Sequence, residues 1–467
     1  MRRQPAFRAA AIAILSAALA GASLGGCTGN SASPILGITG DDSFKVIKVK
    51  AYEVKPFQLS PQIAVNSDEA AFIATGANDF AFRLSAQLAK ENGDHNLVVS
   101  PFSVYLPLAA LLNATTKEHQ QELFTALGAG LERSGYCTPA WADCALIPVS
   151  DMNEVAARML YNLTDARNKA DKEYYNNPLK IANAIFVDKK QTLKPEFAQA
   201  FADYYQGTAI NVDFTSPDAV RRVNNWASDN TDGLIPSLVQ QFDPNTVAAI
   251  ANAIYFSDRW SWEFKPEETK KGEFHNPKGT SIAHFMVHEG NMDYYEDSRL
   301  QAIPLRFKSG GGMYILLPKH GIANELLSDL TANYFNVIDR DKELSNGILK
   351  LPRFEFASDF DGLAETLTEL GVPLFDAETA PLTGGLITSS QKVWLNKAIQ
   401  KAIIKVDEKG TTAAAVTVMM AAGGAAPPQP TTTFEMICDK PFVFVLYGDT
   451  IDGGNQVLFT GIVNQPE

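Results

Sequence analysis

One segment near the C-terminus constrains the fold more than any other part of this sequence. Residues 411–418 read Thr-Thr-Ala-Ala-Ala-Val-Thr-Val, a run of small and β-branched side chains that can form a strand with nothing bulky on either face. Residues 421–428 read Ala-Ala-Gly-Gly-Ala-Ala-Pro-Pro, which is typical of an exposed, flexible loop. A segment that can be a loop in one state and a buried strand in another predicts a conformational trap.

The trap hypothesis makes a specific demand on alternate residues. If a protease cuts the loop beyond Val418, the chain before the cut is free to enter a sheet as a new central strand. Side chains alternate between the two faces of a strand, so one face would carry Thr411, Ala413, Ala415 and Thr417. The alternative is a flexible Ala/Gly/Pro linker, which explains residues 421–430 but not the β-branched alternation or the strand patterns that follow.

The order of the other patterns indicates the fold class. Helical periodicity dominates the early part of the domain, and strand patterns such as 248–256, 313–318 and 434–447 dominate the later part, without βαβ alternation. This favours an α+β fold over a doubly wound sheet. The chain of 467 residues is 46% hydrophobic, so it can bury a large core, and its net charge of −13 argues against a nucleic-acid or anionic-membrane binder.

The N-terminus reads as an export signal. Arg2 and Arg3 precede an apolar run over 9–20 and then Leu-Gly-Gly-Cys at 24–27, which resembles a bacterial lipobox. We therefore expect a signal peptide at 1–26, lipidation of Cys27 and display on the outside of the bacterial cell surface. The alternative is a plain secretory signal with a chance cysteine. Residues 27–66 read as a lipid-anchored tether, and 67–467 as one compact domain.

The three remaining cysteines fall into two groups. Cys137 and Cys144 lie in a polar, Pro-containing stretch, where export makes a local disulfide plausible and a metal pair less so. Cys438 lies in an apolar strand pattern, which predicts a buried free thiol.

Motifs for enzyme chemistry are weak. Residues 21–25 match a Gly-x-Ser-x-Gly elbow, but they lie inside the signal segment. His284 and His288 flank strand-like residues, and positions four apart on a strand are about 13 Å apart, too far to share one metal ion. Residues 310–312 are Gly-Gly-Gly without the Lys-Ser/Thr of a phosphate loop. We expect neither a catalyst, nor a metal site, nor a cofactor.

Beyond these patterns, the sequence resembles the serpins over 67–467. Five segments in the family's order carry the resemblance: 96–103 (Asn-Leu-Val-Val-Ser-Pro-Phe-Ser), 223–226 together with 231–235, 252–260, 408–418, and 436–446 (Met-Ile-Cys-Asp-Lys-Pro-Phe-Val-Phe-Val-Leu). The resemblance implies a serpin fold with mixed β-sheets, eight or nine helices and an exposed reactive-centre loop at about 408–434.

The resemblance also implies an activity. Serpins are suicide substrates: the target serine protease cleaves the loop and forms an acyl-enzyme, and loop insertion into the main sheet traps that covalent complex. The expected partner is thus an extracellular serine protease, bound by a monomer. A non-inhibitory serpin-fold binding protein is the alternative.

Residue roles follow from the same resemblance. Gly410 is the pivot of the hinge, because it lacks a Cβ. Gln400 stands where the family usually has a shutter histidine, and glutamine can donate and accept at once. The remaining expected positions are Glu408, Thr411, Ala413 and Ala415 in the hinge, Ser100, Ser103 and Asn224 in the shutter, and Trp260 at the top of the main sheet.

The scissile bond is less closely fixed by the resemblance. Counting from Glu408 places the bond between Gly424 and Ala425, but the loop is longer than usual. The window therefore includes Met419, Met420, Ala421, Ala422, Gly423 and Ala426. None of these is Arg or Lys, which favours an elastase-like or subtilisin-like target over a trypsin-like one. A papain-like cysteine protease is the alternative target.

Overall fold

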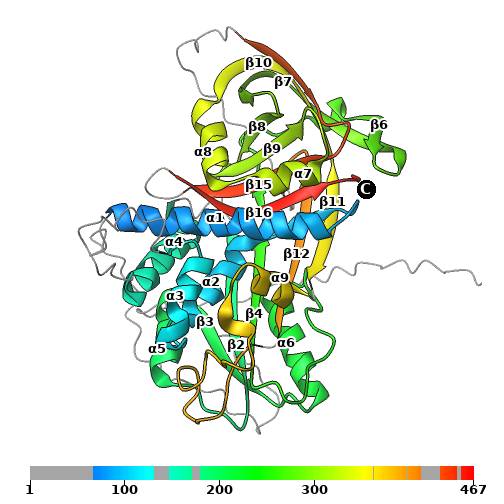
Figure 1. Ribbon diagram of the computed structural model, residues 1–467. Helices are drawn as coiled ribbons and strands as arrows, with labels where there is room; N and C mark the ends of the chain where they lie inside the picture. The colour runs from blue at the N-terminus through cyan, green and yellow to red at the C-terminus, as the bar shows by residue number, and fades with distance from the viewer. Residues whose placement is uncertain are drawn as a thin grey trace, which may run out of the picture. The chain divides into compact units, whose positions relative to one another are not determined.

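Two β-sheets and the helices packed on them make up the computed structural model (Figure 1). It describes residues 67–130, 147–170, 179–360, 362–395, 397–411, 432–449 and 454–466, with the side chains of 67–69 and 165–170 excepted. These residues all belong to one compact unit. Several expectations lie outside them: the signal peptide, the tether, Cys27, Cys137, Cys144, Ala413, Ala415 and the whole scissile window 419–426 with Gly424 and Ala425.

The described residues form nine α-helices, which agrees with the expected eight or nine. They are α1 (Ser67–Glu91), α2 (Pro101–Leu111), α3 (Lys117–Ala126), α4 (Val149–Ala170), α5 (Pro195–Tyr205), α6 (Pro217–Asn230), α7 (Ala323–Asp329), α8 (Ala332–Asp341) and α9 (Leu363–Glu369). None of the helices in the described part of the chain is long and apolar enough to cross a membrane.

The larger sheet has nine strands in the order β1-β16-β15-β9-β8-β7-β10-β14, with β6 paired to β7. Its strands are β1 (Leu97–Val99), β6 (Lys270–Asn276), β7 (Gly279–Glu296), β8 (Leu300–Arg306), β9 (Gly312–Pro318), β10 (Glu343–Pro352), β14 (Thr433–Ile437), β15 (Phe442–Asp449) and β16 (Asn455–Val463).

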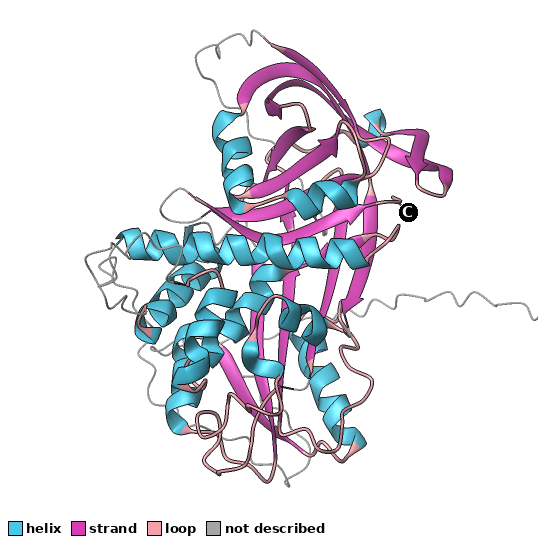
Figure 2. Cartoon of the chain, in the orientation of Figure 1, coloured by secondary structure: helices cyan, strands magenta, loops and turns pink. Residues whose placement is uncertain are grey.

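The smaller sheet has seven strands in the order β3-β2-β4-β12-β13-β5, with β11 paired to β12. Its strands are β2 (Leu179–Asp188), β3 (Gly207–Val212), β4 (Ala248–Phe256), β5 (Asp258–Arg259), β11 (Phe354–Phe360), β12 (Ala398–Asp407) and β13 (Gly410–Thr411). Figure 2 shows strands through both halves of the view, with helices gathered beside them. The mixture of helices and largely antiparallel strands confirms the α+β class.

Helix α2 lies at the centre of the core. Every one of its residues is buried, because the helix is apolar on all sides. Pro101 occupies its first turn, where the missing N–H would have no helical partner. The helix contacts both β4 of the smaller sheet and β16 of the larger one, so it joins the two sheets.

Two segments that read as single strands are each divided in the structure. Residues 348–356 split into β10 and β11 at Arg353, and residues 434–447 split into β14 and β15. Both breaks allow the chain to change partners: β10 pairs with β7, whereas β11 pairs with β12. A hydrophobic pattern alone does not reveal such a change, because both halves of each segment have a strand pattern.

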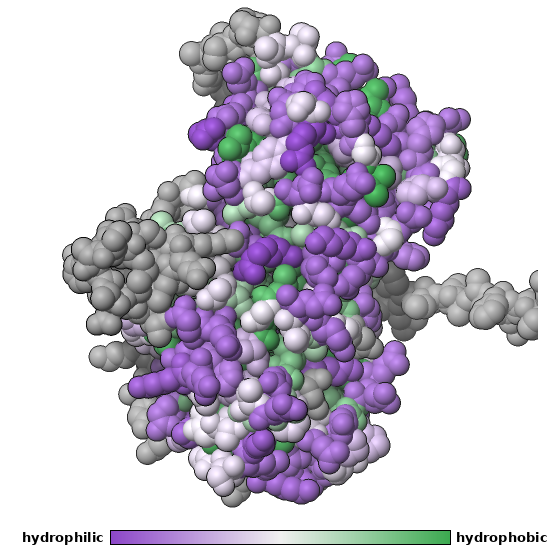
Figure 3. Space-filling view, in the orientation of Figure 1, coloured by the Kyte–Doolittle hydropathy of each residue, from purple (hydrophilic) through white to green (hydrophobic). Residues whose placement is uncertain are grey.

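The surface drawn in Figure 3 is mostly hydrophilic, with hydrophobic residues scattered over it. The large exposed hydrophobic side chains are spread along the described sequence: Leu234, Trp262, Ile282, Ile322 and Leu344. Exposed apolar residues placed singly are ordinary for a soluble protein, and they do not define a docking surface.

Candidate functional site: a slot in the smaller sheet

Strands β4 and β12 of the smaller sheet pair along only a short part of their length. Ala398 lies opposite Ile250 and Ile399 opposite Ala251, in a parallel arrangement. Among the described residues, 252–256 of β4 and 400–405 of β12 have no strand partner on the sides that face each other. We call the space between these two ranges the slot. Its edges are two rows of backbone donors and acceptors, a ready template for another strand.

The hinge occupies the upper end of this slot. Strand β13 (Gly410–Thr411) runs antiparallel between β12 and β5. Thr411 lies opposite Val406 on one side and Asp258 on the other. The sequence interpretation has Thr411 entering the sheet only after cleavage, and here the structure corrects it: Gly410 and Thr411 already pair within the sheet. Pairing within the sheet thus begins at Gly410, one residue before the point expected from the sequence.

The pairings around the slot share one register. A strand that continued beyond Thr411 would run between β12 and β4. Each of its residues would lie between one residue of β12 and one residue of β4, and these two residues are also aligned with each other in the register of the β4–β12 pairing. Residue 417 would then lie between Gln400 and Asn252. The slot therefore accepts an antiparallel strand without a bulge in either ladder.

The side chain of Thr411 shows which face of an inserted strand is buried. It is only 1% exposed, and its hydroxyl accepts a hydrogen bond from the backbone N–H of Asp258 at 3.2 Å. Because alternate residues share a face, 413, 415 and 417 would point to the same side in a continued strand. The sequence has Ala, Ala and Thr there, which add little bulk to the core.

Gly410 is required by its surroundings as well as by its backbone. Its φ of +152° lies in a region that L side chains rarely adopt. A Cβ at this position would lie 2.0 Å from the carbonyl oxygen of Asp258. A side chain at 410 would therefore push β13 away from β5.

Trp260 fastens the root of the hinge. Its indole Nε1–H donates to the carbonyl oxygen of Asp407 at 2.9 Å, and its backbone N–H donates to the carbonyl oxygen of Lys409 at 2.9 Å. The ring is 1% exposed and stacks on Phe307, with 4.8 Å between ring centroids. Trp260, the residue expected at the top of the main sheet, is thus in direct contact with the hinge.

Glu408 is held by an ion pair in which its own side chain is buried and that of Arg353 is partly exposed. Its Oε1 accepts hydrogen bonds from Arg353, whose Nε lies 2.7 Å away, and from the Thr269 hydroxyl. Although burial raises the pKa of the Glu408 carboxyl, these bonds outweigh burial and hold its pKa below the usual value. The carboxylate therefore stays ionised and ties the hinge to the residue that separates β10 from β11.

At the lower end of the slot, the structure brings Gln400, Ser100 and Ser103 together. The Gln400 Nε2 donates to the Ser100 carbonyl oxygen at 2.7 Å and to the Ser103 hydroxyl at 2.6 Å, and its Oε1 accepts from the Ser100 N–H at 3.1 Å. The Ser100 hydroxyl donates to the carbonyl oxygen of Leu458 at 2.7 Å. One glutamine thus links β12 to the start of α2.

Asn224, expected in this cluster, is not brought to it. Its side chain on α6 donates to the carbonyl oxygen of Val239 at 2.9 Å and accepts from the N–H groups of Leu238 and Val239. It organises the loop that follows α6. An asparagine side chain can both donate to and accept from the backbone of a loop, so sequence alone does not separate this role from a place in the core.

Two residues that sequence reasoning missed lie beside the cluster instead. Asn183 of β2 and Asn252 of β4 are directly opposite each other, and Asn252 Nδ2 donates to Asn183 Oδ1 at 2.7 Å. The signal that could have found them is a polar residue in the middle of each apolar strand pattern, since buried amides need partners. Asn183, Asn252 and Gln400 therefore form a row across the sheet.

The outer face of the slot is covered by residues that follow α6. A cavity of about 160 Å³ lies between Leu234 and Ile235 of this segment and Ile254 and Ile403 of the two strands. On the same face, Lys405 pairs with Glu355 at 2.8 Å and Lys401 with Asp359 at 3.8 Å. This cavity leaves room for outward-facing side chains of an additional strand.

The histidines and the cysteine behave as their patterns indicate. His284 and His288 lie on the extended strand β7, and Cys438 is a buried free thiol whose pKa is raised by burial. Among the described side chains, no group of three or more potential metal ligands is found.

The chain matches a known protein family over most of its length. The family model described as "Serpin (serine protease inhibitor)" matches residues 75–466. "Alpha-1-antitrypsin" of Sus scrofa is 25% identical over 398 residues, which cover 84% of this chain and 87% of that protein. A serpin-like protein of Methanosarcina acetivorans is 29% identical over 437 residues, which cover 90% of this chain and 95% of that protein.

Two solved structures share the fold. Human thyroxine-binding globulin complexed with thyroxine has a TM-score of 0.71 at 22% identity, covering 85% of this chain and 99% of that one. The thermophilic serpin tengpin in its native state has a TM-score of 0.69 at 24% identity, covering 86% of this chain and 95% of that one. Because both sequence identities are below 25%, these likenesses show a shared fold and nothing more specific.

Proposed function

Because the chain belongs to the serpin family, whose members act as protease inhibitors and not as catalysts, we propose that it inhibits an extracellular serine protease as a suicide substrate. The observation that carries this proposal is the slot between β4 and β12, with the hinge seated at its upper end in a register that continues along both edges. A site of this shape accepts one more strand, and the residues that follow Thr411 can supply it.

The proposed sequence of events starts at the loop. The protease serine attacks a loop carbonyl, the peptide bond breaks, and the new amine leaves while the acyl group stays on the serine as an ester. The freed strand then fills the slot from residue 412 downward, continuing from Thr411, which is already paired. Residues 418 and 419 reach the level of Ile399 and Ala398, so full insertion requires the Ile250–Ala398 and Ala251–Ile399 pairs to separate. Trapping succeeds if insertion precedes hydrolysis of the ester.

The proposed target has a shallow primary pocket. Residues 419–426 contain only Met, Ala and Gly. Small side chains suit elastase-like or subtilisin-like proteases, and Gly424–Ala425 is the proposed bond within that window. Mass spectrometry of the loop after reaction with a panel of proteases identifies the bond. A main cleavage outside 419–426 would contradict the assignment.

The proposed location is the outer surface of a bacterial cell, through lipidation of Cys27. The basic, apolar and Leu-Gly-Gly-Cys segments support it. Labelling with a radioactive fatty acid tests the anchor: the label should follow the wild-type chain to the membrane fraction and should be absent from Cys27→Ser. We further propose that the inhibitor acts as a monomer, which light scattering checks.

Incubation with an elastase tests the inhibitory function. We expect an SDS-stable complex of protease and inhibitor. Thr411→Arg should convert the inhibitor into a substrate, because a charge would enter a side-chain position that is 1% exposed, while cleavage of the loop proceeds. Thr411→Ser, which keeps the hydroxyl, is the matched control and should still inhibit. Full inhibition by Thr411→Arg would rule out insertion through the slot.

A second candidate is a serpin that binds a ligand without inhibiting. The observation that favours it is the hinge itself, because Gly410 and Thr411 are already in the sheet and less of the hinge is free to drive insertion. Clean cleavage by every protease tested, with full protease activity retained, would select this candidate.

A further inference from the structure

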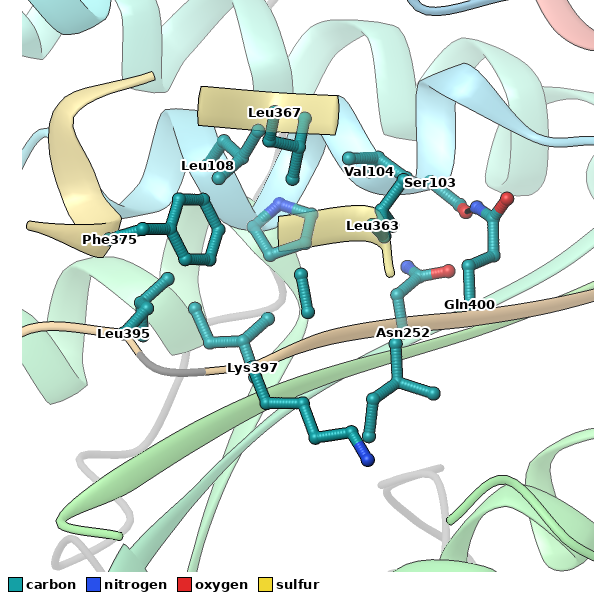
Figure 4. A pocket seen from close by; sticks show the side chains of 14 residues that line it. Ser103, Val104, Leu108, Asn252, Leu363, Leu367, Phe375, Leu395, Lys397 and Gln400 are labelled. Carbon is teal, nitrogen blue, oxygen red and sulfur yellow. Dashed lines mark hydrogen bonds between the residues drawn. The ribbon is translucent and has the colours of Figure 1, made fainter. Parts of the chain in front are cut away.

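The upper end of the slot depends on β5, a strand of only two residues. These two residues, Asp258 and Arg259, pair with the hinge. At the lower end of the slot, by contrast, a side chain joins two longer elements, because Gln400 of β12 meets Ser103 of α2 (Figure 4). A strand as short as β5 has few bonds of its own, so its place in the sheet depends on what lies against it.

The turn between β8 and β9 lies against β5 and supports its backbone. The N–H of Lys308 donates to the carbonyl oxygen of Arg259 at 2.9 Å. The N–H of Ser261, which follows β5 closely in the chain, donates to the carbonyl oxygen of Arg306 at 2.8 Å. The turn thus pairs with β5 and its continuation much as a neighbouring strand would.

The Asp258 carboxylate adds a side-chain contact to this pairing. Asp258 is buried, and its Oδ2 accepts from the Ser309 N–H at 3.2 Å and from the Ser309 hydroxyl. Its Oδ1 accepts from the N–H of Arg259 at 2.7 Å. A buried carboxylate needs such donors, and hydrogen bonds to an ionised acceptor are stronger than neutral ones. We call the contact between the Asp258 carboxylate and Ser309 the clasp.

The glycine run at 310–312, which lacks the residues of a phosphate loop, shapes the same turn. Gly310 and Gly311 have φ angles of +95° and +67°, and a Cβ at Gly311 would lie 2.3 Å from a carbonyl oxygen of β15. The Gly311 N–H donates to Asp449 Oδ2 at 2.7 Å. Two carboxylates therefore hold the turn, Asp449 of β15 on one side and Asp258 of β5 on the other.

Asp258 also contacts the hinge, through its backbone. Its N–H donates to the Thr411 hydroxyl at 3.2 Å. Because the Trp260 N–H donates to the carbonyl oxygen of Lys409, and backbone directions alternate along a strand, the backbone of Thr411 faces β5 as well. The amide hydrogen of Thr411 therefore reports whether β13 is seated on β5. One residue, Asp258, holds the turn with its side chain and the hinge with its backbone.

We propose that the clasp fixes β5 as the seat of the hinge, and that Asp258 thereby positions Thr411 for the start of insertion. Loss of the clasp removes the side-chain tie between β5 and the turn, so the pairing of Thr411 with β5 opens more often. The residues after Thr411 can extend the ladder only while that pairing is closed. The effect on inhibition rests on the proposed function, whereas the seating of the hinge does not.

Hydrogen exchange of the Thr411 amide in the full, uncleaved chain tests the seat. Asp258→Ala removes the carboxylate, and the exchange should become faster by about tenfold. Asp297→Ala is the matched control, because Asp297 caps the turn at the other end of β8 by accepting from the N–H groups of Arg299 at 2.7 Å and Leu300 at 3.0 Å. It should leave exchange at Thr411 unchanged. Unchanged exchange in Asp258→Ala, or an equal increase in both variants, would overturn the proposal.

A milder variant covers the case in which Asp258→Ala does not fold. Ser309→Ala removes the hydroxyl donor of the clasp and keeps the Ser309 backbone N–H. Exchange at Thr411 should become faster than in the wild type, by less than in Asp258→Ala. If Ser309→Ala is the only folded variant, wild-type exchange in it would overturn the proposal.

The stoichiometry of inhibition of an elastase tests the consequence for insertion. Asp258→Ala should be consumed in greater excess for each SDS-stable complex, because insertion starts later while hydrolysis of the ester proceeds as before. Asp297→Ala should keep the wild-type stoichiometry. Faster exchange at Thr411 with wild-type stoichiometry would contradict a role of Asp258 in insertion. A wild-type chain that forms no complex would contradict the proposed function, and the exchange measurement would still decide on the seat.

Discussion

At the scale of single residues, the root of the hinge is fixed by four residues with different physical roles. Glu408 is held by an ion pair with Arg353, and Trp260 holds the backbone at Asp407 and Lys409. Gly410 is selected by a contact that leaves no room for a Cβ. The hinge is therefore a defined structure up to Thr411, and not simply the start of a loop.

Replacement of Gly410 by alanine should release β13 from the sheet. The added Cβ would meet the Asp258 carbonyl oxygen, and the backbone at φ +152° is strained for alanine. Hydrogen exchange at Thr411 should become faster by at least tenfold, which corresponds to about 1.4 kcal/mol. Gly371→Ala is the control, since Gly371 also has positive φ but open space around it. Equal effects of both variants would show that the contact with Asp258 is unimportant.

The acid stability of the protein should depend on Glu408. Its folded-state pKa is lowered, so its carboxylate contributes stability that is present above the unfolded pKa of about 4.3 and is lost as the pH falls through the folded pKa. Glu408→Gln should lower the melting temperature at pH 7, and the difference from wild type should shrink below about pH 4. Glu343→Gln, at an exposed position, should leave the pH profile unchanged. A constant difference at all pH values would contradict the ion-pair explanation.

At the scale of elements, the junction of α2 and β12 decides whether the sheet can open. Helix α2 is buried on all sides and contacts both sheets, so it is the fixed support on which β12 rests. Gln400 connects the two elements through three hydrogen bonds to the first turn of α2. Opening of the slot thus acts directly on this junction.

Loss of the Gln400 amide should therefore destabilise the uncleaved protein. Gln400→Leu leaves the buried Ser100 N–H without its Gln400 partner, at a cost of about 1–3 kcal/mol, and removes one of the two hydrogen bonds to the Ser100 carbonyl oxygen, which keeps the bond from the Ser103 hydroxyl. The melting temperature should fall clearly. Gln391→Leu removes an exposed glutamine that bonds Gln191, and it should change the melting temperature little. A small effect of Gln400→Leu would show that the junction is held by apolar packing alone.

At the scale of the whole molecule, the structure is short of the pairing that its own smaller sheet allows. Ranges 252–256 and 400–405 offer two edges, and the described part of the chain fills only the end next to β13. Completion of the ladder would add backbone hydrogen bonds to both edges. The uncleaved protein therefore has a reserve of unrealised pairing, which is the basis of the proposed trap.

Cleavage of the loop should accordingly raise thermal stability. With about 1 kcal/mol for each new backbone hydrogen bond, insertion of residues 412–417 should raise the melting temperature by about 10 °C or more. Calorimetry of the intact and the elastase-cleaved chain measures it. Cleaved Thr411→Arg should not reach the same value, which separates insertion from a general effect of cleavage. Identical melting curves of intact and cleaved wild type would contradict the slot as the site of insertion.

Much of the fold could be predicted from the sequence because its elements depend on local periodicity. The strand pattern at 248–256 became β4, and the α+β class follows from the order of the patterns. The serpin fold was predicted from five ordered segments, and the family model and solved structures confirm it. The same resemblance identified seven of the described site residues: Glu408, Gly410, Thr411, Trp260, Ser100, Ser103 and Gln400.

The sequence by itself determined which residues are small, polar or β-branched, and therefore which segment can change between loop and strand. Only the tertiary structure decided how far that change has gone, because the insertion of Gly410 and Thr411 depends on pairing with β5, which is distant in the chain. It also placed Asn252, and not Asn224, beside Gln400. Both asparagines look alike in sequence, and only the pairing of β2 with β4 and the loop after α6 give each one its partners.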